Sequence, residues 1–432
     1  MERLWTKNFI LLVLGQVCSL FGNTMLRLAL SMYLLEKTGS AAVFAGFLSA
    51  AVLPTILLSP FGGVLADRGD KRLLMVFLDV LAGGVVLCAA LALTEQNAIL
   101  LIGTLMIVLS VLGAFETPTV QACIPMMLTG GNITKGNAVV NQAASLSSLA
   151  APALGGVFYA MFGLEPVMFA SVACFFLTAL AECFIRLGEQ RGKKEGGLFS
   201  GVWNDFAIGI RFLLQEERDI LHLLLLAAGS RFFVMGVTVV GLPFLVRTVL
   251  GLGAEYAGAA ESVSAVAVIL GSGTAGLLAE KWKTGRLAFV LAAMGASLFP
   301  AGAAFLLPFG AGARYAAVAA SFFGMSLAVS IFSIFAVSLI QQRTPNVLMG
   351  RVMAHTAAVT LCAQPLGQMA YGFLFDIFRN SVAAVLIPTG IFVCAVGLFS
   401  VGFFRGFEAK ETRDMGTFGG EFTSDRGRRD CL

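Results

Sequence analysis

The chain contains a long series of apolar segments, and each is long enough to cross a lipid bilayer as a helix. A helix needs about 20 apolar residues to cross a hydrocarbon layer of about 30 Å. Segments of this kind lie at residues 8–34, 42–64, 73–93, 98–121, 136–160, 166–187, 220–248, 256–279, 287–307, 314–339, 351–375 and 381–404. Backbone groups cannot stay unpaired in hydrocarbon, so we expect helices and not strands. The sequence therefore predicts an all-α membrane protein with twelve transmembrane helices.

The composition also indicates that lipid is the main solvent of this chain. Hydrophobic residues make up 58% of it and charged residues only 12%, whereas soluble domains carry about 25% charged residues. The net charge of +4 comes from short basic runs between apolar segments. A nucleic-acid-binding surface would instead gather basic residues on one face. We therefore expect contact with membrane lipid and no nucleic acid partner.

The placement of lysine and arginine predicts the orientation in the membrane. Most of these residues fall on one side of the predicted spans, and the opposite side holds only Lys37, Arg247, Arg314 and Arg379. Basic loops stay in the cytoplasm. The pattern predicts a multi-pass protein of the plasma or inner membrane with both termini in the cytoplasm.

An internal repeat divides the chain into two halves. Residues 63–68 (GVLADR) match residues 276–281 (GLLAEK), and Pro152 matches Pro365 at the same separation of 213 residues. The predicted organisation is an N-terminal six-helix half at 1–187, a cytoplasmic linker at 188–219, a C-terminal six-helix half at 220–404 and a disordered cytoplasmic tail at 405–432. Within the linker, residues 202–214 have the apolar spacing of a helix that lies on the membrane surface. Six helices and a cytoplasmic linker return the chain to the same side, so the halves are predicted to be parallel repeats.

Three motifs resemble those of the major facilitator superfamily. Residues 62–72 (GGVLADRGDKR) are similar to the signature loop between its helices two and three. Residues 151–156 (APALGG) resemble the helix-five motif of its antiporter branches, although Ala151 stands where the family has glycine. Thr344 and Pro345, followed by residues 350–353 (GRVM), resemble the macrolide-efflux and enterobactin-exporter-like branch. The resemblance implies two six-helix bundles and transport by alternating access.

The resemblance also implies a latch on the cytoplasmic side. Thr344 and Pro345 have the residue types of a helix start, so we expect them to begin the helix leading into span eleven. A helix N-terminus attracts a carboxylate, and in the family such a contact by Asp67 closes the cytoplasmic side. The candidate gate residues are Gly63, Asp67, Arg68, Arg72, Gly350 and Arg351. For the basic residues, the alternative is that they only set topology and contact lipid headgroups.

The helix-five motif predicts a smooth and bendable helix face. Pro152 removes one backbone hydrogen bond, and Gly155 and Gly156 permit close helix crossing. Such a face suits a moving gate, and simple tight packing is the equally open alternative.

Polar residues inside the predicted spans indicate a substrate cavity. Ionisable groups in a membrane are costly and mark functional sites. The candidate cavity residues are Gln16, Asn23, Arg27, Arg231, Gln364 and Gln368. In the family, helices one, four, seven and ten line the cavity, which adds Glu116 and the helix-ten serines Ser326, Ser330 and Ser333. Such a mixed lining suits an amphipathic organic solute better than a hydrated ion.

Proton coupling requires a buried carboxyl group that each side of the membrane reaches in turn. The candidates are Glu116, Asp79 and Glu261, and our hypothesis assigns the coupling proton to Glu116. Glu261 has a second interpretation as the structural partner of Arg231 or Arg27.

These features favour a secondary exporter that uses protons to move a hydrophobic or amphipathic molecule, antibiotic-like or siderophore-like, out of the cell. A nutrient symporter and a non-transporting membrane receptor are the alternatives. The loops contain no clustered nucleophile, acid and base, and no Walker A motif, so an enzyme is not expected. The scattered cysteines and histidines predict no metal site, and we expect no cofactor and a monomer.

Overall fold

The computed structural model describes residues 4–129, 131–186, 218–278, 284–345 and 348–426. The N-terminal half contains α1 (Lys7–Thr38), α2 (Ala41–Arg68), α3 (Lys71–Ala92), α4 (Ala98–Met127), α5 (Gly131–Phe162) and α6 (Leu164–Cys183). The C-terminal half contains α8 (Arg218–Val234), η2 (Met235–Gly241), α9 (Leu242–Phe244), η3 (Leu245–Val249), α10 (Ala254–Leu278), η4 (Thr284–Arg286), α11 (Leu287–Ala296), α12 (Phe299–Leu306), α13 (Ala311–Arg343), α14 (Met349–Ile377) and α15 (Ala383–Arg426).

These elements provide the twelve predicted transmembrane helices. Within the described ranges, 11 segments are long and apolar enough to cross a bilayer. Several are built from consecutive elements: α8, η2, α9 and η3 form span seven, and η4, α11 and α12 form span nine. The twelfth is α14, which has 29 residues. Its polar residues Thr360, Gln364 and Gln368 face a cavity described below.

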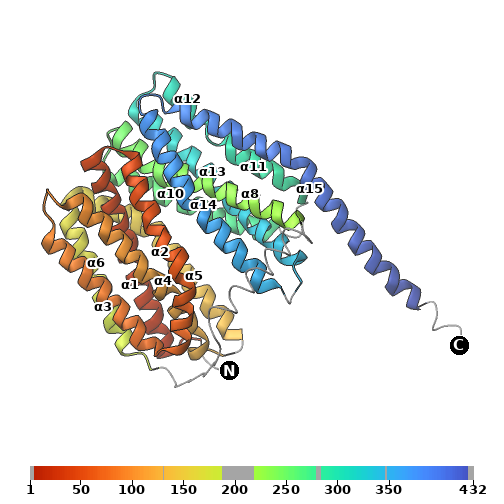
Figure 1. Cartoon of the computed structure of the whole chain (residues 1–432), viewed down its shortest axis with the longest axis horizontal. Coiled ribbons are helices and arrows are strands. Elements are labelled where there is room, and N and C mark those ends of the chain that lie inside the picture. Colours follow the sequence, from red (N-terminus) through yellow and green to blue (C-terminus); the bar gives the residue numbers. More distant parts are fainter. Residues whose placement is uncertain (1–3, 130, 187–217, 279–283, 346–347, 427–432) are drawn as a thin grey trace.

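The helices form two bundles that lie next to each other (Figure 1). The N-terminal bundle, coloured red to yellow, and the C-terminal bundle, coloured green to blue, diverge toward the end that carries the chain termini. We call the opposite end, which includes residues 36–41 and 376–382, the distal end. There the two bundles are joined by the direct contacts given below.

Short local signals set several helix boundaries. The Ser40 hydroxyl caps α2 by accepting a hydrogen bond from the Val43 amide at 3.2 Å, and Asp70 caps α3 by accepting from the Leu73 amide at 3.1 Å. Such caps satisfy amides that have no partner inside the helix. Gly39 ends α1 with a φ of 60°, a left-handed conformation that glycine adopts without strain. Two long helices can therefore turn back on each other within two residues.

Apolar side chains lie both in the interior and on the exterior of the bundles. Phe44, Phe175 and Phe322 are almost fully buried, whereas Phe399 is 88% exposed and Leu277 is 82% exposed. Large exposed apolar surfaces are rare on soluble monomers. Lipid is the environment in which this exterior is stable.

Span seven is wound partly as a π-helix, in η2 and η3. π-helical turns are rare and often lie at functional sites. A side chain at Gly236 of η2 would meet the Gly367 carbonyl of α14 at 2.6 Å. The wide turn thus lies directly against α14, next to the cavity.

The connection between α13 and α14 corrects one prediction. Thr344 does not begin the helix leading into span eleven, but ends α13 as its C-cap. Its hydroxyl donates to the Ile340 carbonyl at 2.6 Å, one turn back in α13. The next helix begins at Met349, and the Leu348 amide just before it donates to the Pro345 carbonyl at 2.9 Å.

Of the two segments predicted to lie outside the spans, the structure describes most of the C-terminal tail but very little of the linker. Nearly all of the linker at 188–219, including the surface helix at 202–214, lies outside the described residues. Helix α15 continues beyond its membrane-spanning part, Ala383–Glu408, as far as Arg426. It therefore extends across most of the tail for which the sequence predicts disorder.

Candidate transport cavity

A cavity of about 1090 Å³ lies between the two halves. Its walls come from α1, α2, α4 and α5 on one side and from α8, η2, α10, α13 and α14 on the other. Along α14 the lining extends from Gln368 back to Met353, close to the first turn of the helix, and along α13 it reaches Val337. The cavity therefore extends away from the distal end, toward the end with the chain termini.

Five of the six predicted cavity residues line this space: Asn23, Arg27, Arg231, Gln364 and Gln368. The helix-ten serines Ser326, Ser330 and Ser333 line it as well. Gln16 does not, although it shares a helix face with Asn23. It is 6% exposed and lies inside the N-terminal bundle, because the first half of α1 packs among the other helices of that bundle. Phe322 and Phe332, on the same helix as these serines, are fully buried.

An ion pair crosses the cavity between the halves. The Arg27 guanidinium on α1 lies 3.3 Å from a carboxylate oxygen of Glu261 on α10. The structure thus pairs Glu261 with Arg27, one of the two partners that the sequence left open. The two side chains are 51% and 36% exposed, so water in the cavity reaches them. Solvent-exposed pairs of this kind contribute little to stability, typically below about 1 kcal/mol.

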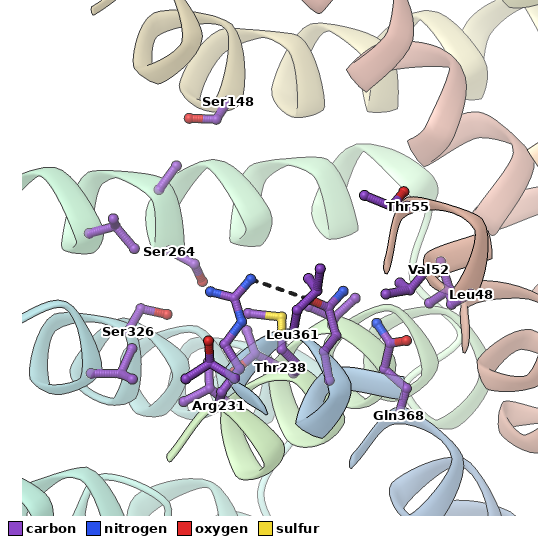
Figure 2. A pocket seen from close by; sticks show the side chains of 18 of the residues that line it. Leu48, Val52, Thr55, Ser148, Arg231, Thr238, Ser264, Ser326, Leu361 and Gln368 are labelled. Carbon is purple, nitrogen blue, oxygen red and sulfur yellow. Dashed lines mark hydrogen bonds between the residues drawn. The ribbon is translucent and has the colours of Figure 1, made fainter. Parts of the chain in front are cut away.

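The second cavity arginine has a neutral partner. Arg231 on α8 donates a hydrogen bond to the Gln364 side-chain oxygen on α14 at 3.2 Å. Figure 2 shows the Arg231 side chain pointing into the pocket, in a region that also contains Ser264, Ser326 and Thr238. No carboxylate forms an ion pair with Arg231 among the residues that the structure describes.

The distal end joins the two halves through a carboxylate at a helix N-terminus. Asp376 on α14 accepts hydrogen bonds from the Ser40 hydroxyl at 2.5 Å, the Ala41 amide at 2.7 Å and the Ala42 amide at 3.0 Å. The last two amides belong to the first turn of α2, where a negative charge is favourable. Asp376 thus caps a helix of the other half.

An ion pair strengthens this junction. The Arg247 guanidinium of η3 lies 2.5 Å from Glu36 on α1, and the Tyr159 hydroxyl donates to the same carboxylate at 3.0 Å. Deeper in the molecule, the Ser49 hydroxyl on α2 donates to the Pro365 carbonyl on α14 at 3.1 Å. These contacts join the halves at the distal end and, deeper in the molecule, between α2 and α14.

The helix-five motif lies at the crossing of α5 and α10. A side chain at Gly156 would meet the Ala254 carbonyl of α10 at 2.6 Å, and one at Gly155 would meet Met25 of α1 at 2.7 Å. Pro152 lines the cavity one turn away. The motif thus lies where a helix of one half crosses a helix of the other, a place that fits both tight packing and a moving gate.

The remaining proton-coupling candidates, Asp79 and Glu116, do not line the cavity but lie in a carboxylate cluster inside the N-terminal bundle. The expectation that Glu116 lines the cavity was therefore wrong. The Ser19 hydroxyl on α1 lies 3.3 Å from Asp79 on α3 and also 3.3 Å from Glu116 on α4. Glu182 on α6 lies next to Asp79. Asp79 and Glu182 are each only 1% exposed. We call Asp79, Glu116 and Glu182 the carboxylate cluster.

Glu182 was not among the residues predicted from the sequence. It lies near the end of the predicted span at 166–187, where a charged residue is ordinary. One signal was present: Glu182 is an acidic residue in an otherwise apolar run. The structure shows that α6 packs along α1 and α3, and this packing places Glu182 among the other two acids.

The predicted latch residues lie at two helix ends. Gly63, Asp67 and Arg68 belong to the last turns of α2, and Gly350 and Arg351 to the first turn of α14. The side chains of these five positions lie outside the described part of the structure. Arg72 donates to the Cys183 carbonyl at the end of α6, so this residue contacts its own half.

Comparison with known proteins is consistent with the fold and the cavity. The family model of the Major Facilitator Superfamily matches residues 12–362, and the chain belongs to this family of membrane transporters. Macrolide efflux protein A of Streptococcus pyogenes is 25% identical over 377 residues, which cover 86% of this chain and 90% of the relative. The uncharacterized MFS-type transporter YfiS of Bacillus subtilis is 25% identical over 406 residues, covering 91% and 93%.

Solved structures show the same fold. A bacterial homologue of the iron transporter ferroportin, crystallised in an inward-facing state, gives a TM-score of 0.69 at 15% identity, with 91% of this chain and 98% of that chain covered. A D-xylose–proton symporter gives 0.67 at 13% identity, with 90% and 96% covered. The chain is thus a transporter and not an enzyme.

Proposed function

We propose that this protein is a proton-coupled exporter of an amphipathic or hydrophobic small molecule, working by alternating access. The observation that carries the proposal is the cavity of about 1090 Å³ between the two halves. Its volume and mixed apolar and hydroxyl lining suit a drug-sized organic molecule. Relatives named for macrolide efflux support outward transport and an antibiotic-like substrate.

The charge distribution supports an assignment of the side of the membrane to which the cavity opens. The basic residues are concentrated toward the end that carries the chain termini, which the positive-inside rule assigns to the cytoplasm. On this assignment the distal end faces outward and is closed by Asp376 and by the Glu36–Arg247 pair. The cavity is then open to the cytoplasm, the state in which an exporter loads its substrate.

The carboxylate cluster supports proton coupling. The Ser19 hydroxyl has one proton to donate but lies within reach of both Asp79 and Glu116. Both oxygens of Glu182 and Asp79 Oδ2 lack a hydrogen-bond donor among the described residues. Neighbouring carboxyl groups share a hydrogen bond only when one of them carries a proton. We assign the coupling proton to this cluster, with Glu116 as the member nearest the cavity-lining Thr117.

A susceptibility screen tests the proposal. A strain lacking its own drug exporters is transformed with this gene and challenged with chemically diverse antibiotics, with and without a protonophore. We expect a raised minimum inhibitory concentration for some amphipathic compounds, which the protonophore abolishes. Uptake of the same compounds, faster in expressing cells than in control cells, would instead indicate a symporter.

A further inference from the structure

The cavity carries one positive charge that its own residues do not neutralise. Three charged residues line it in the described part of the chain: Arg27, Arg231 and Glu261. Arg27 and Glu261 form an ion pair at 3.3 Å and cancel. Arg231 remains, with only the neutral Gln364 oxygen as its hydrogen-bond partner.

Arg231 is exposed to the cavity, so its guanidinium is open to a ligand. Charged side chains inside a membrane protein normally pair or mark a substrate path. The guanidinium has five N–H donors in a planar fork, and the contact with Gln364 occupies one edge of it at most. The remaining donors suit the two oxygens of a carboxylate, sulfonate or phosphate.

Two hydroxyls of the cavity wall direct their protons to backbone carbonyls and not to a ligand. Ser264 donates its proton to the Ala260 carbonyl at 3.0 Å, and Ser330 donates to the Val268 carbonyl at 2.9 Å. Each hydroxyl has a single proton, so these two serines present acceptor lone pairs to the cavity. The cation at Arg231 (Figure 2) is therefore the feature that selects the charge of a ligand.

Much of the remaining cavity lining is apolar. Leu48, Val52, Met106, Val234 and Met235 line the same space. Apolar lining binds the body of a ligand through burial of its hydrophobic surface. A ligand that matches both features has an apolar body and one anionic group.

We propose that the substrate class of this cavity is an amphipathic organic anion whose anionic group binds Arg231. This inference rests on the cavity being the substrate site of the proposed function. It does not depend on the direction of transport or on proton coupling.

Two dyes with the same xanthene body and opposite charge test the proposal. Fluorescein is anionic and rhodamine 123 is cationic at pH 8. The full-length protein in lipid nanodiscs is titrated against each dye by fluorescence polarisation, with empty nanodiscs subtracted. We expect fluorescein to bind more tightly than rhodamine 123.

Variants identify the residue. Arg231→Gln is expected to weaken fluorescein binding about 10-fold or more, equivalent to about 1.4 kcal/mol, and to leave rhodamine 123 unchanged or tighter. Arg231→Lys should retain part of the affinity. Arg186→Gln, at an exposed position at the end of α6, is the matched control and should bind like the wild type.

A second variant, Glu261→Gln, tests the proposal if Arg231→Gln does not fold. Glu261→Gln removes the only described acid of the cavity and releases Arg27, so fluorescein should bind several-fold more tightly. Three results would overturn the inference: weaker fluorescein binding by Glu261→Gln, equal affinity of the wild type for both dyes, or an equal loss of affinity for both dyes in Arg231→Gln. The protein could bind the anionic dye through Arg231 and still give no efflux in the susceptibility screen. That result would support the inference and contradict the export function.

Discussion

At the scale of single residues, the acidic side chains fall into two groups with different surroundings. Glu261 lies in the cavity opposite a permanent cation, Arg27. Asp79 and Glu182 lie inside the N-terminal bundle, 1% exposed, next to each other and without a described cation as an ion-pair partner. An ion-paired carboxylate favours the charged form, whereas adjacent carboxyl groups favour a shared proton. The two groups are therefore suited to different tasks, substrate contact and proton carriage.

Replacement of Glu182 tests the second task. Glu182→Gln keeps the shape of the side chain but cannot release a proton, so drug-driven proton movement should fall to the background of empty vesicles. The measurement is dequenching of a pH-gradient dye in everted vesicles upon addition of a drug identified by the screen.

Glu165→Gln is the control for this variant, because Glu165 is an exposed residue of the same helix, α6. It should retain full coupling. Wild-type proton movement in Glu182→Gln, with normal folded yield, would remove Glu182 from the coupling site.

At the scale of secondary-structure elements, the N-terminus of α2 and the C-terminal end of α14 form the main polar junction between the halves. Three hydrogen-bond donors from Ser40, Ala41 and Ala42 converge on Asp376. The predicted cytoplasmic latch would use the same two helices at their other ends, with Asp67 of α2 at the start of α14. The helix pair α2 and α14 would then close both sides of the membrane in turn. On each side, an aspartate near the C-terminal end of one helix would bind the N-terminus of the other helix.

Removal of the Asp376 carboxylate should favour opening of the distal end. Loss of a helix N-cap costs about 0.5–2 kcal/mol, which changes the ratio of the two states by roughly 2- to 30-fold. Spin labels on the distal ends of the two halves, measured by double electron–electron resonance, should show a larger population at long distance in Asp376→Ala.

Glu95→Ala provides the comparison for this variant. Glu95 also lies near the distal end, but its partner Lys37 belongs to the same half, and its side chain is 89% exposed. Its distance distribution should match that of the wild type, and an unchanged distribution in Asp376→Ala would exclude a role of this cap in closure.

At the scale of the whole molecule, the proposed alternating access would have the two bundles tilt against each other about the cavity. The crossing of α5 and α10 has no room for side chains at Gly156, where a side chain would meet the Ala254 carbonyl at 2.6 Å. Interfaces of small residues allow helices to pack closely with few side-chain interlocks. Such a crossing is suited to sliding of one half over the other.

A covalent link across the distal end should stop this motion. In the double variant Ser40→Cys, Asp376→Cys, an oxidant should form a disulfide between the halves and abolish efflux, and a reductant should restore it. The replaced side chains are in direct contact, with 2.5 Å between Oγ and Oδ2.

The double variant Lys37→Cys, Glu95→Cys links two positions of one half and should remain active after oxidation. Each single cysteine variant should also be insensitive to the oxidant. Continued efflux by the fully cross-linked Ser40–Asp376 variant would contradict movement of the halves at this end.

The fold and much of the site were predictable because both depend on features that are periodic or local in the chain. The length of each apolar run predicts a spanning helix, and polar residues such as Asn23, Arg231 and Gln364 inside those runs predict a cavity. Gln16 was misplaced because helical spacing indicates a shared face but does not show how far a cavity extends along it. Thr344 was misassigned because threonine before proline is compatible with the end of one helix as well as with the start of the next.

The sequence by itself determined that this protein spans a membrane with twelve helices in two related halves, because in hydrocarbon the backbone has few ways to satisfy its hydrogen bonds. Only the tertiary structure decided which charges meet. It paired Glu261 with Arg27, left Arg231 with a neutral partner, brought Glu182 to Asp79 and set Asp376 on the N-terminus of α2. These contacts join helices far apart in the chain, and the tilt and rotation of packed helices are set by side-chain packing that no local pattern specifies.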